Sequence, residues 1–366
     1  MYNCRICENI SFKELVNLGE SPIANSLLKK LSDKKNEKKL PLRVNVCDKC
    51  YLAQLSEIKD PSLIFNKDYV YYSGHSQTWK QHCKNYKIMI AHKLKLTSES
   101  HVVEIASNDG TMLKFFLNDN IKVTGVDPST SCCLIAKKNN IHTLNNFFVK
   151  DIARKIISER GQADLIIANN VLAHVPDLDS FISAFKILLD KDGLITFEFP
   201  YFLNLIKFNQ FDTIYHEHYY YLSVTPLVKL FEVHFLEICD ISEIDIHGGS
   251  LRIYVCHKDS KHSNSKAVKN FIDKEKKFFN SNFINQFNKN IFEIRKNTLN
   301  FFDKVKKNNE LVVGYGAPAK GNTFLNYLGL NSNDIAFTVD KNKVKQNKFL
   351  PGSHIPVYDI DKLNKV

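Results

Sequence analysis

Residues 211–221 (FDTIYHEHYYY) carry the densest group of reactive side chains in this chain of 366 residues. They hold two imidazoles, two carboxylates and four phenols. The pKa of histidine lies near neutrality, so a histidine here can act as a general base, and a phenol beside it can stabilise negative charge on an oxygen. The stretch therefore predicts proton abstraction. A His-x-His metal site is the alternative, although the sequence offers it no third ligand.

Regular alternation of strands and helices precedes and follows this stretch. It predicts an α/β fold with a mostly parallel, doubly wound sheet of seven strands, the last two of them adjacent in sequence. Ligands of such sheets lie outside the carboxyl ends of the strands. The expected strands are 101–106, 122–126, 141–144, 164–168, 194–198, 236–245 and 250–257, and the expected helices are 77–96, 111–117, 129–138, 148–159, 178–189 and 225–231.

Polar residues at three of these strand ends predict a site for an adenosine-containing cofactor. Small residues after the first strand let a ligand approach the backbone, and an acid at the end of the second strand can bind both hydroxyls of a ribose. The turn lacks the full G-x-G-x-x-G pattern, which disfavours NAD and favours S-adenosylmethionine (SAM). The predicted cofactor-binding residues are Glu104, Ala106, Ser107, Asn108, Asp109, Gly110, Asp127, Pro128, Asn169 and Asn170.

A second strand–turn–helix lies near the C-terminus, with a strand at 310–313, the turn GYGAPAKG at 314–321 and a helix at 322–328. Its glycines permit close approach to the backbone, and Lys320 can meet a phosphate. A further strand at 335–339 ends in Asp340. This pattern predicts a smaller α/β domain that binds a nucleotide. Taken alone, the turn could equally hold NAD.

Four of the nine cysteines form two C-x2-C pairs, Cys4 with Cys7 and Cys47 with Cys50. Four thiolates suit a closed, structural zinc site, and the long segment between the pairs must form its own loop or hairpin. A redox pair is the rival interpretation, but it would not need two such pairs. The other five cysteines lie in apolar or helical surroundings and are expected in the core.

The composition is that of an ordinary globular protein, with 44% hydrophobic and 24% charged residues. No apolar run approaches the length of a membrane span, and the N-terminal residues lack the pattern of a signal peptide, so we expect a cytoplasmic protein. The formal charge of +11 favours phosphorylated small molecules over nucleic acid, because the lysines are not interleaved with aromatic residues.

Six motifs together resemble the sugar C-methyltransferases that act on nucleotide-linked 4-keto-6-deoxy sugars, such as the 3-C-methyltransferase of tetronitrose biosynthesis. They are the two C-x2-C pairs, VVEIASNDGT, NNVLAHVPD, FDTIYHEHYYYLS, HGGSLRIYV and GYGAPAKGNTFLNY. The resemblance covers nearly the whole chain. It implies an N-terminal zinc-binding domain (1–66), a central class I SAM methyltransferase domain (67–260) and a C-terminal Rossmann-like domain that binds the nucleotide sugar (261–366). It also implies a monomer.

The resemblance assigns roles to particular residues. His218 matches the proposed general base, Tyr215 and Glu217 match its neighbours on the sugar, and His174 matches a further active-site histidine. A tyrosine of the segment 68–72 should also reach the site, with Tyr69 favoured over Tyr72, although an ordinary β-edge would explain this segment equally well. The expected substrate-binding residues are Tyr72, Gly316, Ala317, Lys320, Gly321, Asn322 and Asp340.

This assignment constrains the local structure. In an extended strand Tyr215 and Glu217 would face away from His218, so residues 215–218 should form an irregular loop, with His216 in a packing or capping role. Two features depart from the family pattern. Ala106 stands where many relatives have glycine, and residues 219–221 form a tyrosine run that could alter the pocket.

Three functions are compatible with the sequence. The leading one is SAM-dependent C-methylation of a 4-keto sugar at C3. The second is O- or N-methylation of a nucleotide sugar, which needs no ketone. The third is an NAD-linked or non-catalytic sugar-binding protein that uses the second glycine-rich turn.

Overall fold

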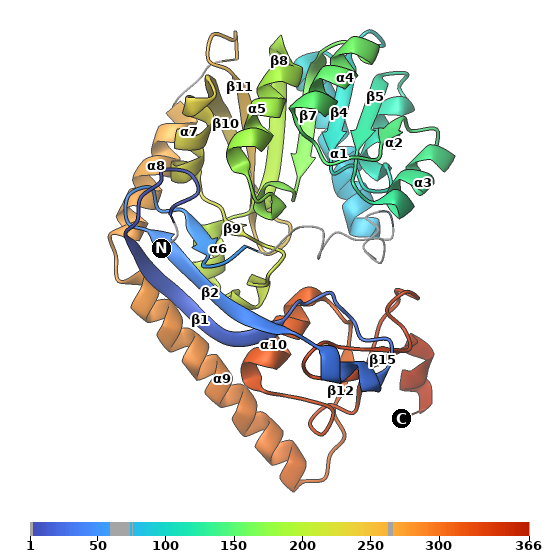
Figure 1. Ribbon diagram of the computed structural model, residues 1–366, viewed down its shortest axis with the longest axis vertical. Helices are drawn as coiled ribbons and strands as arrows, with labels where there is room; N and C mark the ends of the chain where they lie inside the picture. The colour runs from blue at the N-terminus through green and yellow to red at the C-terminus, as the bar shows by residue number, and fades with distance from the viewer. Residues whose placement is uncertain (1–2, 59–73, 75, 263–265, 366) are drawn as a thin grey trace.

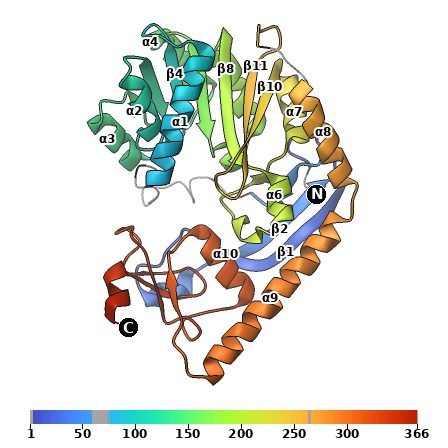
Figure 2. The same ribbon diagram turned by 180° about the vertical axis from the view of Figure 1, so that it is seen from behind.

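The computed structural model describes residues 3–58, 74, 76–262 and 266–365. A seven-stranded sheet with helices on both faces lies above a smaller C-terminal α/β unit, and a long N-terminal hairpin runs between them (Figures 1 and 2). In the described part of the chain, no helix is long and apolar enough to cross a membrane.

The central sheet has the strand order β10-β11-β8-β7-β4-β5-β6. Its first five strands in the chain are parallel, while β11 runs antiparallel to β8 and β10 runs antiparallel to β11. The order reverses between β4 and β7, which is where doubly wound sheets bind ligands. The strands are β4 (His101–Ile105), β5 (Lys122–Val126), β6 (Thr143–Leu144), β7 (Ala163–Asn169), β8 (Leu189–Pro200), β10 (Leu236–Ile244) and β11 (Ser250–His257).

Helices cover both faces of this sheet, as the amphipathic pattern predicts. On one face, α1, α2 and α3 bury Tyr86 and Phe116. On the other, α4, α5 and α7 bury Phe185 and Phe231 against Phe197 of β8. The helices are α1 (Gln77–Leu94), α2 (Thr111–Leu117), α3 (Thr130–Lys138), α4 (Lys150–Arg160), α5 (Leu178–Leu188) and α7 (Val224–Val233), with the short α6 (Phe202–Lys207) and the 3-10 turns η4 (Leu172–His174) and η5 (Phe211–Thr213) near the sheet's carboxyl edge.

The N-terminal unit is a four-stranded antiparallel sheet, ordered β1-β2-β3-β9. β1 (Phe12–Pro22) and β2 (Lys39–Cys47) form the hairpin expected between the cysteine pairs, and their connection carries the short η1 (Leu31–Asn36). β3 (Ala53–Leu55) pairs with β9 (Tyr220–Tyr221), which lies far along the chain. The tyrosine run therefore has a structural role that we did not predict, because it docks the N-terminal unit beside the central sheet.

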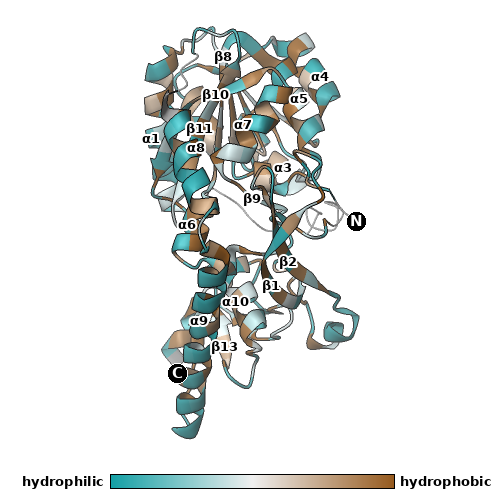
Figure 3. Ribbon diagram, turned by 90° about the vertical axis from the view of Figure 1, so that its left-hand side faces the viewer, coloured by the Kyte–Doolittle hydropathy of each residue, from teal (hydrophilic) through white to brown (hydrophobic). Residues whose placement is uncertain are grey.

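The C-terminal part begins with two helices, α8 (Lys266–Phe279) and α9 (Phe283–Lys307). α9 runs from the central sheet to the smaller unit and is mostly hydrophilic along its length (Figure 3). The smaller sheet has the order β12-β13-β15-β14 around a core of Ile355 and Val357. Its elements are β12 (Val313–Tyr315), α10 (Ala319–Leu328), β13 (Phe337–Val339), β14 (Lys348–Phe349), β15 (Pro356–Tyr358) and η6 (Ile360–Lys365).

The boundaries of the second strand–turn–helix differ from those predicted. The strand lies at Val313–Tyr315 rather than at 310–313, and the helix begins at Ala319 rather than at residue 322. Pro318 explains the earlier start, because its extended backbone (φ −78°, ψ 158°) lets the chain turn directly into the helix.

Candidate active site

One large cavity, of about 1640 Å³, lies at the carboxyl edge of the central sheet. Its wall comes from three parts of the chain: the tip of the N-terminal hairpin, the strand ends of the central sheet together with the loop that carries Tyr215 and His218, and the C-terminal unit. A cavity of this size can hold two small molecules side by side.

Buried polar side chains line the cavity at the ends of β4 and β7. Glu104 is 5% exposed, and its Oε2 has no hydrogen-bond partner among the described residues. The Oδ1 and Nδ2 atoms of Asn169 are also buried without a hydrogen-bond partner among the described residues. Unpaired buried groups are costly unless a ligand satisfies them. These atoms therefore fit SAM, whose ammonium group and hydroxyls can supply the missing partners.

Two buried carboxylates, Glu104 and Asp127, lie at this edge. Asp127 accepts hydrogen bonds from the backbone N–H groups of Asn108 (2.9 Å) and Ser129 (2.8 Å), which fixes it at the end of β5. Burial raises the pKa of both Glu104 and Asp127, and the negative charge of Asp109 raises each of them further. A cationic ligand would relieve this repulsion.

Most of the predicted cofactor residues lie on the cavity wall: Glu104, Ala106, Ser107, Asn108, Asp127, Pro128, Asn169 and Asn170. Asp109 and Gly110 lie behind it. The Asp109 carboxylate accepts hydrogen bonds from the hydroxyl of Thr111 (2.6 Å) and the N–H of Gly74 (2.8 Å), and Gly110 begins α2 with φ +78°. Ala106 has φ +56°, which is the left-handed conformation that glycine would adopt more easily.

Residues 215–218, the predicted proton-transfer residues, form a tight turn rather than a strand. The backbone N–H of His218 donates to the carbonyl of Tyr215 at 2.9 Å, so the chain reverses within residues 215–218. The turn brings the rings of Tyr215 and His218 together, with centroids 4.0 Å apart. The irregular loop required by the sequence is therefore present.

Hydrogen bonds fix the tautomer of His218. Its Nδ1 donates to the carbonyl of Thr213 at 3.0 Å, which leaves Nε2 as an acceptor for the hydroxyl of Tyr215 at 2.9 Å. Burial, and the nearby His174, hold the pKa of His218 well below its ordinary value. His218 is therefore neutral near pH 7, which is the state that a base needs.

His174, at the end of η4, lies beside this pair, and its ring centroid is 4.9 Å from that of His218. Its Nδ1 donates to the carbonyl of Glu217 at 2.5 Å. Burial lowers its pKa as well. Both histidines therefore line the cavity as neutral rings.

Glu217 and His216 point in different directions from the turn. The Glu217 carboxylate is 2% exposed and belongs to the cavity wall, where its Oε1 accepts two hydrogen bonds from Asn25. The Nε2 of His216 instead donates to the carbonyl of Leu40 on β2 at 3.3 Å. His216 thus has the packing role predicted for it. The four cysteines are the one group of three or more potential metal ligands that lie close together among the described residues, and His216 and His218 bind different backbone carbonyls.

The C-terminal unit supplies a basic wall. Lys320 and Asp340 line the cavity as predicted, together with Lys341, Lys343, Lys345 and Lys348. Asp340 accepts from the backbone N–H of Ala317 at 2.8 Å, and the Nζ of Lys345 donates to the carbonyl of Ala317 at 2.8 Å. Gly316, Ala317, Gly321 and Asn322 support this turn from behind and are not part of the wall.

Sequence reasoning missed several wall residues. Asn25 and His247 carry polar groups that reach the cavity, and Trp79 lies near His247 at a ring-centroid distance of 6.3 Å. His247 begins the HGGS motif, which could have signalled it; Asn25 gave no signal, because it lies 192 positions before its partner Glu217. Tyr69 and Tyr72 lie outside the described residues.

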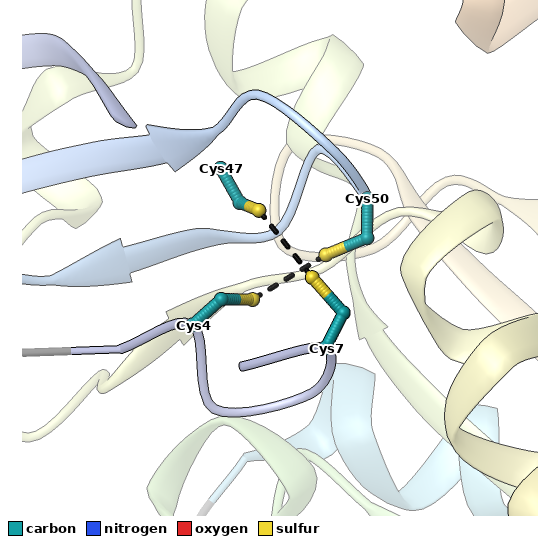
Figure 4. A group of neighbouring side chains, drawn as sticks. All are labelled: Cys4, Cys7, Cys47 and Cys50. Atoms are coloured by element: carbon teal, nitrogen blue, oxygen red, sulfur yellow. Dashed lines mark hydrogen bonds between the residues drawn. The ribbon is translucent and has the colours of Figure 1, made fainter. Parts of the chain in front are cut away.

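The four cysteines predicted as metal ligands come together at the base of the hairpin (Figure 4). Their sulfur atoms all lie within 4.8 Å of one another, with Cys4 and Cys50 at 3.4 Å and Cys7 and Cys47 at 3.6 Å. Zinc–sulfur bonds of about 2.3 Å in a tetrahedron place the sulfurs about 3.8 Å apart. The group therefore fits a closed zinc site with no position left for substrate.

Comparisons with known proteins agree with this arrangement. Family models match as a zinc binding domain (residues 4–65), a methyltransferase domain (80–237) and a C-methyltransferase C-terminal domain (245–366). The C-methyltransferase NovU of Streptomyces niveus is 32% identical over 357 residues, covering 97% of this chain and 85% of the relative. The chain belongs to this C-methyltransferase family. It is thus a SAM-dependent C-methyltransferase with a four-cysteine zinc-binding domain.

Solved structures of methyltransferases match about half of this chain. A magnesium protoporphyrin IX methyltransferase from Synechocystis with bound SAM has a TM-score of 0.41 and 13% identity, over 55% of this chain and 99% of the other. A SAM-dependent methyltransferase from Anabaena variabilis has a TM-score of 0.40 and 20% identity, over 56% and 99%.

Proposed function

We propose that this C-methyltransferase methylates C3 of a nucleotide-linked 4-keto-6-deoxy sugar. The observation that carries the proposal is the Tyr215 hydroxyl held 2.9 Å from the acceptor nitrogen of a neutral, half-buried His218. Carbon methylation requires a carbon nucleophile. A ketone at C4 acidifies the C3–H bond, and a base beside a hydrogen-bond donor suits the enolate that follows.

Tyr215 and His218 match two neighbouring positions on such a sugar. The ketone oxygen and the C3 hydrogen sit on adjacent carbons, as the hydroxyl and the Nε2 are adjacent in the site. When the ketone enters, the Tyr215 hydroxyl turns from His218 to the ketone oxygen, which frees the Nε2 lone pair. The C3 proton then moves to Nε2, and the C–H electrons become the enolate, whose oxygen the Tyr215 hydroxyl stabilises by donating a hydrogen bond.

The methyl transfer and the release of the proton need no further reactant. Glu104, Asp127 and Asn169 would hold SAM, which when bound would supply an electrophilic methyl group at its sulfonium. The enolate electrons form the new C3–methyl bond, the sulfur–methyl bond breaks, and the ketone is restored. His218 then releases its proton to solvent. Glu217 Oε2 accepts a hydrogen bond from a sugar hydroxyl, and Lys320 and its neighbouring lysines meet the diphosphate.

Mass spectrometry of products formed from methyl-labelled SAM tests this function. A panel of nucleotide-linked 4-keto sugars should give singly methylated products in which the label sits on C3. The matched 4-hydroxy sugars should give none, because their C3–H is not acidified. Methylation of the 4-hydroxy sugars, with the label on oxygen or nitrogen, would contradict the proposal.

Exchange of the C3 hydrogen offers a second test that does not depend on methyl transfer. In D₂O and without SAM, the protein should exchange the C3 hydrogen of the 4-keto sugar for deuterium. The exchange should disappear in Tyr215→Phe and His218→Asn variants. Exchange that persists in His218→Asn would assign the base to another group.

A further inference from the structure

The carboxylate of Glu217 is held by a residue from the N-terminal unit. Asn25 donates twice to the same oxygen, Oε1, through its backbone N–H (3.2 Å) and its side-chain Nδ2 (3.0 Å). The other oxygen, Oε2, is buried and has no partner among the described residues. A carboxylate that served only to stabilise the fold would satisfy both oxygens.

We propose that Asn25 is a positioning residue, which fixes Glu217 so that one carboxylate oxygen is presented to the sugar in the cavity. The proposal rests on the proposed function for the identity of the sugar. It gives the zinc-binding unit a part in the active site, since Asn25 itself belongs to the cavity wall.

Asn25 can fix another residue because the chain holds it from both sides. Before it, β1 pairs with β2 as far as Pro22. After it, Leu28 pairs with Phe349 of β14, with backbone hydrogen bonds of 3.0 and 2.9 Å. Its own turn is closed by the Ser26 N–H, which donates to the carbonyl of Ile23 at 3.1 Å. Asn25 therefore sits where the hairpin meets both the catalytic turn and the C-terminal unit.

The two donors also set the charge state of Glu217. Burial raises the pKa of this carboxyl, while hydrogen bonds from its own backbone N–H and from the two donors of Asn25 lower it. The titratable groups around it are Tyr221 on β9, whose own pKa the Glu217 charge raises, and the neighbouring His174 and His218. Removal of the side-chain donor should raise the pKa of Glu217, because donors favour the charged form.

Carboxyl NMR of the resting protein tests this link without substrate. In protein labelled with ¹³C at the glutamate carboxyl, the signal of Glu217 is the one that Glu217→Gln removes. Asn25→Ala should raise its pKa by about one unit, that is about tenfold in the proton equilibrium. Asn25→Asp, which keeps the size and places a second carboxylate there, should raise it further.

Asn17→Ala is the matched control, because Asn17 is an exposed asparagine of the same hairpin. Among the described residues its side chain accepts from the Gly19 N–H alone, so the pKa of Glu217 should not move. Zinc content and Tm report whether each variant folds, and the similarly sized Asn25→Asp carries the test if Asn25→Ala does not fold. An unchanged pKa of Glu217 in a folded Asn25 variant overturns the proposal.

A double-mutant cycle on methyl transfer tests whether Asn25 acts through Glu217. Asn25→Ala should lower kcat/KM about tenfold in the wild-type background but less than about twofold in the Glu217→Gln background. Equal losses in both backgrounds would mean a merely structural role and overturn the proposal. If the wild-type protein methylates no 4-keto sugar, the proposed function fails, while the NMR titration still decides the role of Asn25.

Discussion

The two strand–turn–helix units that face the cavity share a backbone plan and differ in charge. In the central sheet, Asp127 accepts from the N–H of Asn108 in the first turn and from Ser129 two residues after itself. In the C-terminal unit, Asp340 accepts from Ala317 in its first turn and from Asn342 two residues after itself. In each case the carboxylate at the end of the second strand ties the first turn to the second.

The side chains that surround these turns have opposite signs. Glu104 and Asp127 line the cavity from the central sheet, whereas Lys320, Lys345 and their neighbours line it from the C-terminal unit. The same backbone plan can therefore serve a cationic sulfonium cofactor on one side and an anionic diphosphate on the other. The two turns differ more in the charge around them than in backbone plan, and this charge difference is what distinguishes the ligands that we propose for them.

The largest expected effect comes from His218, the proposed base, which lies between the two units. His218→Asn removes the acceptor nitrogen and should lower kcat by about 10³-fold, in the range for loss of a general base. SAM and the nucleotide sugar should each bind within about twofold of wild type, because neither turn is touched. Single-turnover kinetics and isothermal titration measure both quantities. If His218→Asn turns over substrate as fast as the wild type, His218 is not the general base.

A crossed pair of substitutions tests the division of charge. Glu104→Gln should weaken SAM about tenfold and leave the nucleotide sugar unchanged, since it removes the buried negative charge from one side only. Lys320→Ala should do the reverse, and its loss should shrink at high salt because screening weakens a phosphate contact. Isothermal titration of each variant with each ligand gives four numbers. If either variant binds both ligands more weakly than the wild type, the two units do not divide the ligands by charge.

The pH profile provides a smaller and more specific test. Burial and His174 lower the pKa of His218. At neutral pH His218 is therefore almost entirely unprotonated, and it becomes protonated only as the pH falls through the lowered pKa. We expect kcat/KM to be nearly constant above pH 7, with the half-point of the acid limb below pH 6.5. Glu217→Gln should be measured in parallel, since the raised pKa of Glu217 can contribute to the same limb. A half-point at or above 6.5 in both proteins would contradict a lowered histidine pKa.

The sequence predicted features that depend on local patterns. Strand and helix periodicity led to the sheet and its cofactor edge, and the spacing of Cys4, Cys7, Cys47 and Cys50 led to the zinc site. The irregular turn at residues 215–218 followed from the need to bring Tyr215 and His218 together. Each of these inferences uses residues that are close in sequence or repeat at a fixed period.

Features that depend on distant pairing could not be predicted in the same way. Nothing in the tyrosine run signals that Tyr220 and Tyr221 pair with β3, because their side chains suggested a pocket while their backbone forms the strand. Asn25 likewise could not be identified from the sequence, because its contact with Glu217 forms only when the N-terminal hairpin packs across the molecule. Glu275 is a third case: it is fully buried and accepts from the N–H groups of Val224 and Thr225 at the start of α7.

The smallest expected effect is on stability. It concerns the residue that directly follows the first strand of each unit, which is Ala106 after β4 and Gly316 after β12. Ala106 and Gly316 both have positive φ, at +56° and +95°. Ala106→Gly should stabilise the protein by up to about 1 kcal/mol, because the strain of a left-handed alanine slightly outweighs the entropy that glycine loses. Gly316→Ala should cost about 1–2 kcal/mol through backbone strain alone, since a Cβ there would meet only Pro318 at 3.5 Å. Gly161→Ala, with φ +85° and open space around its Cβ position, is the control, and urea unfolding of the three variants measures the changes. A similar loss of unfolding free energy in Gly316→Ala and Gly161→Ala would show that backbone strain accounts for the cost at Gly316. A much larger loss in Gly316→Ala would contradict this explanation.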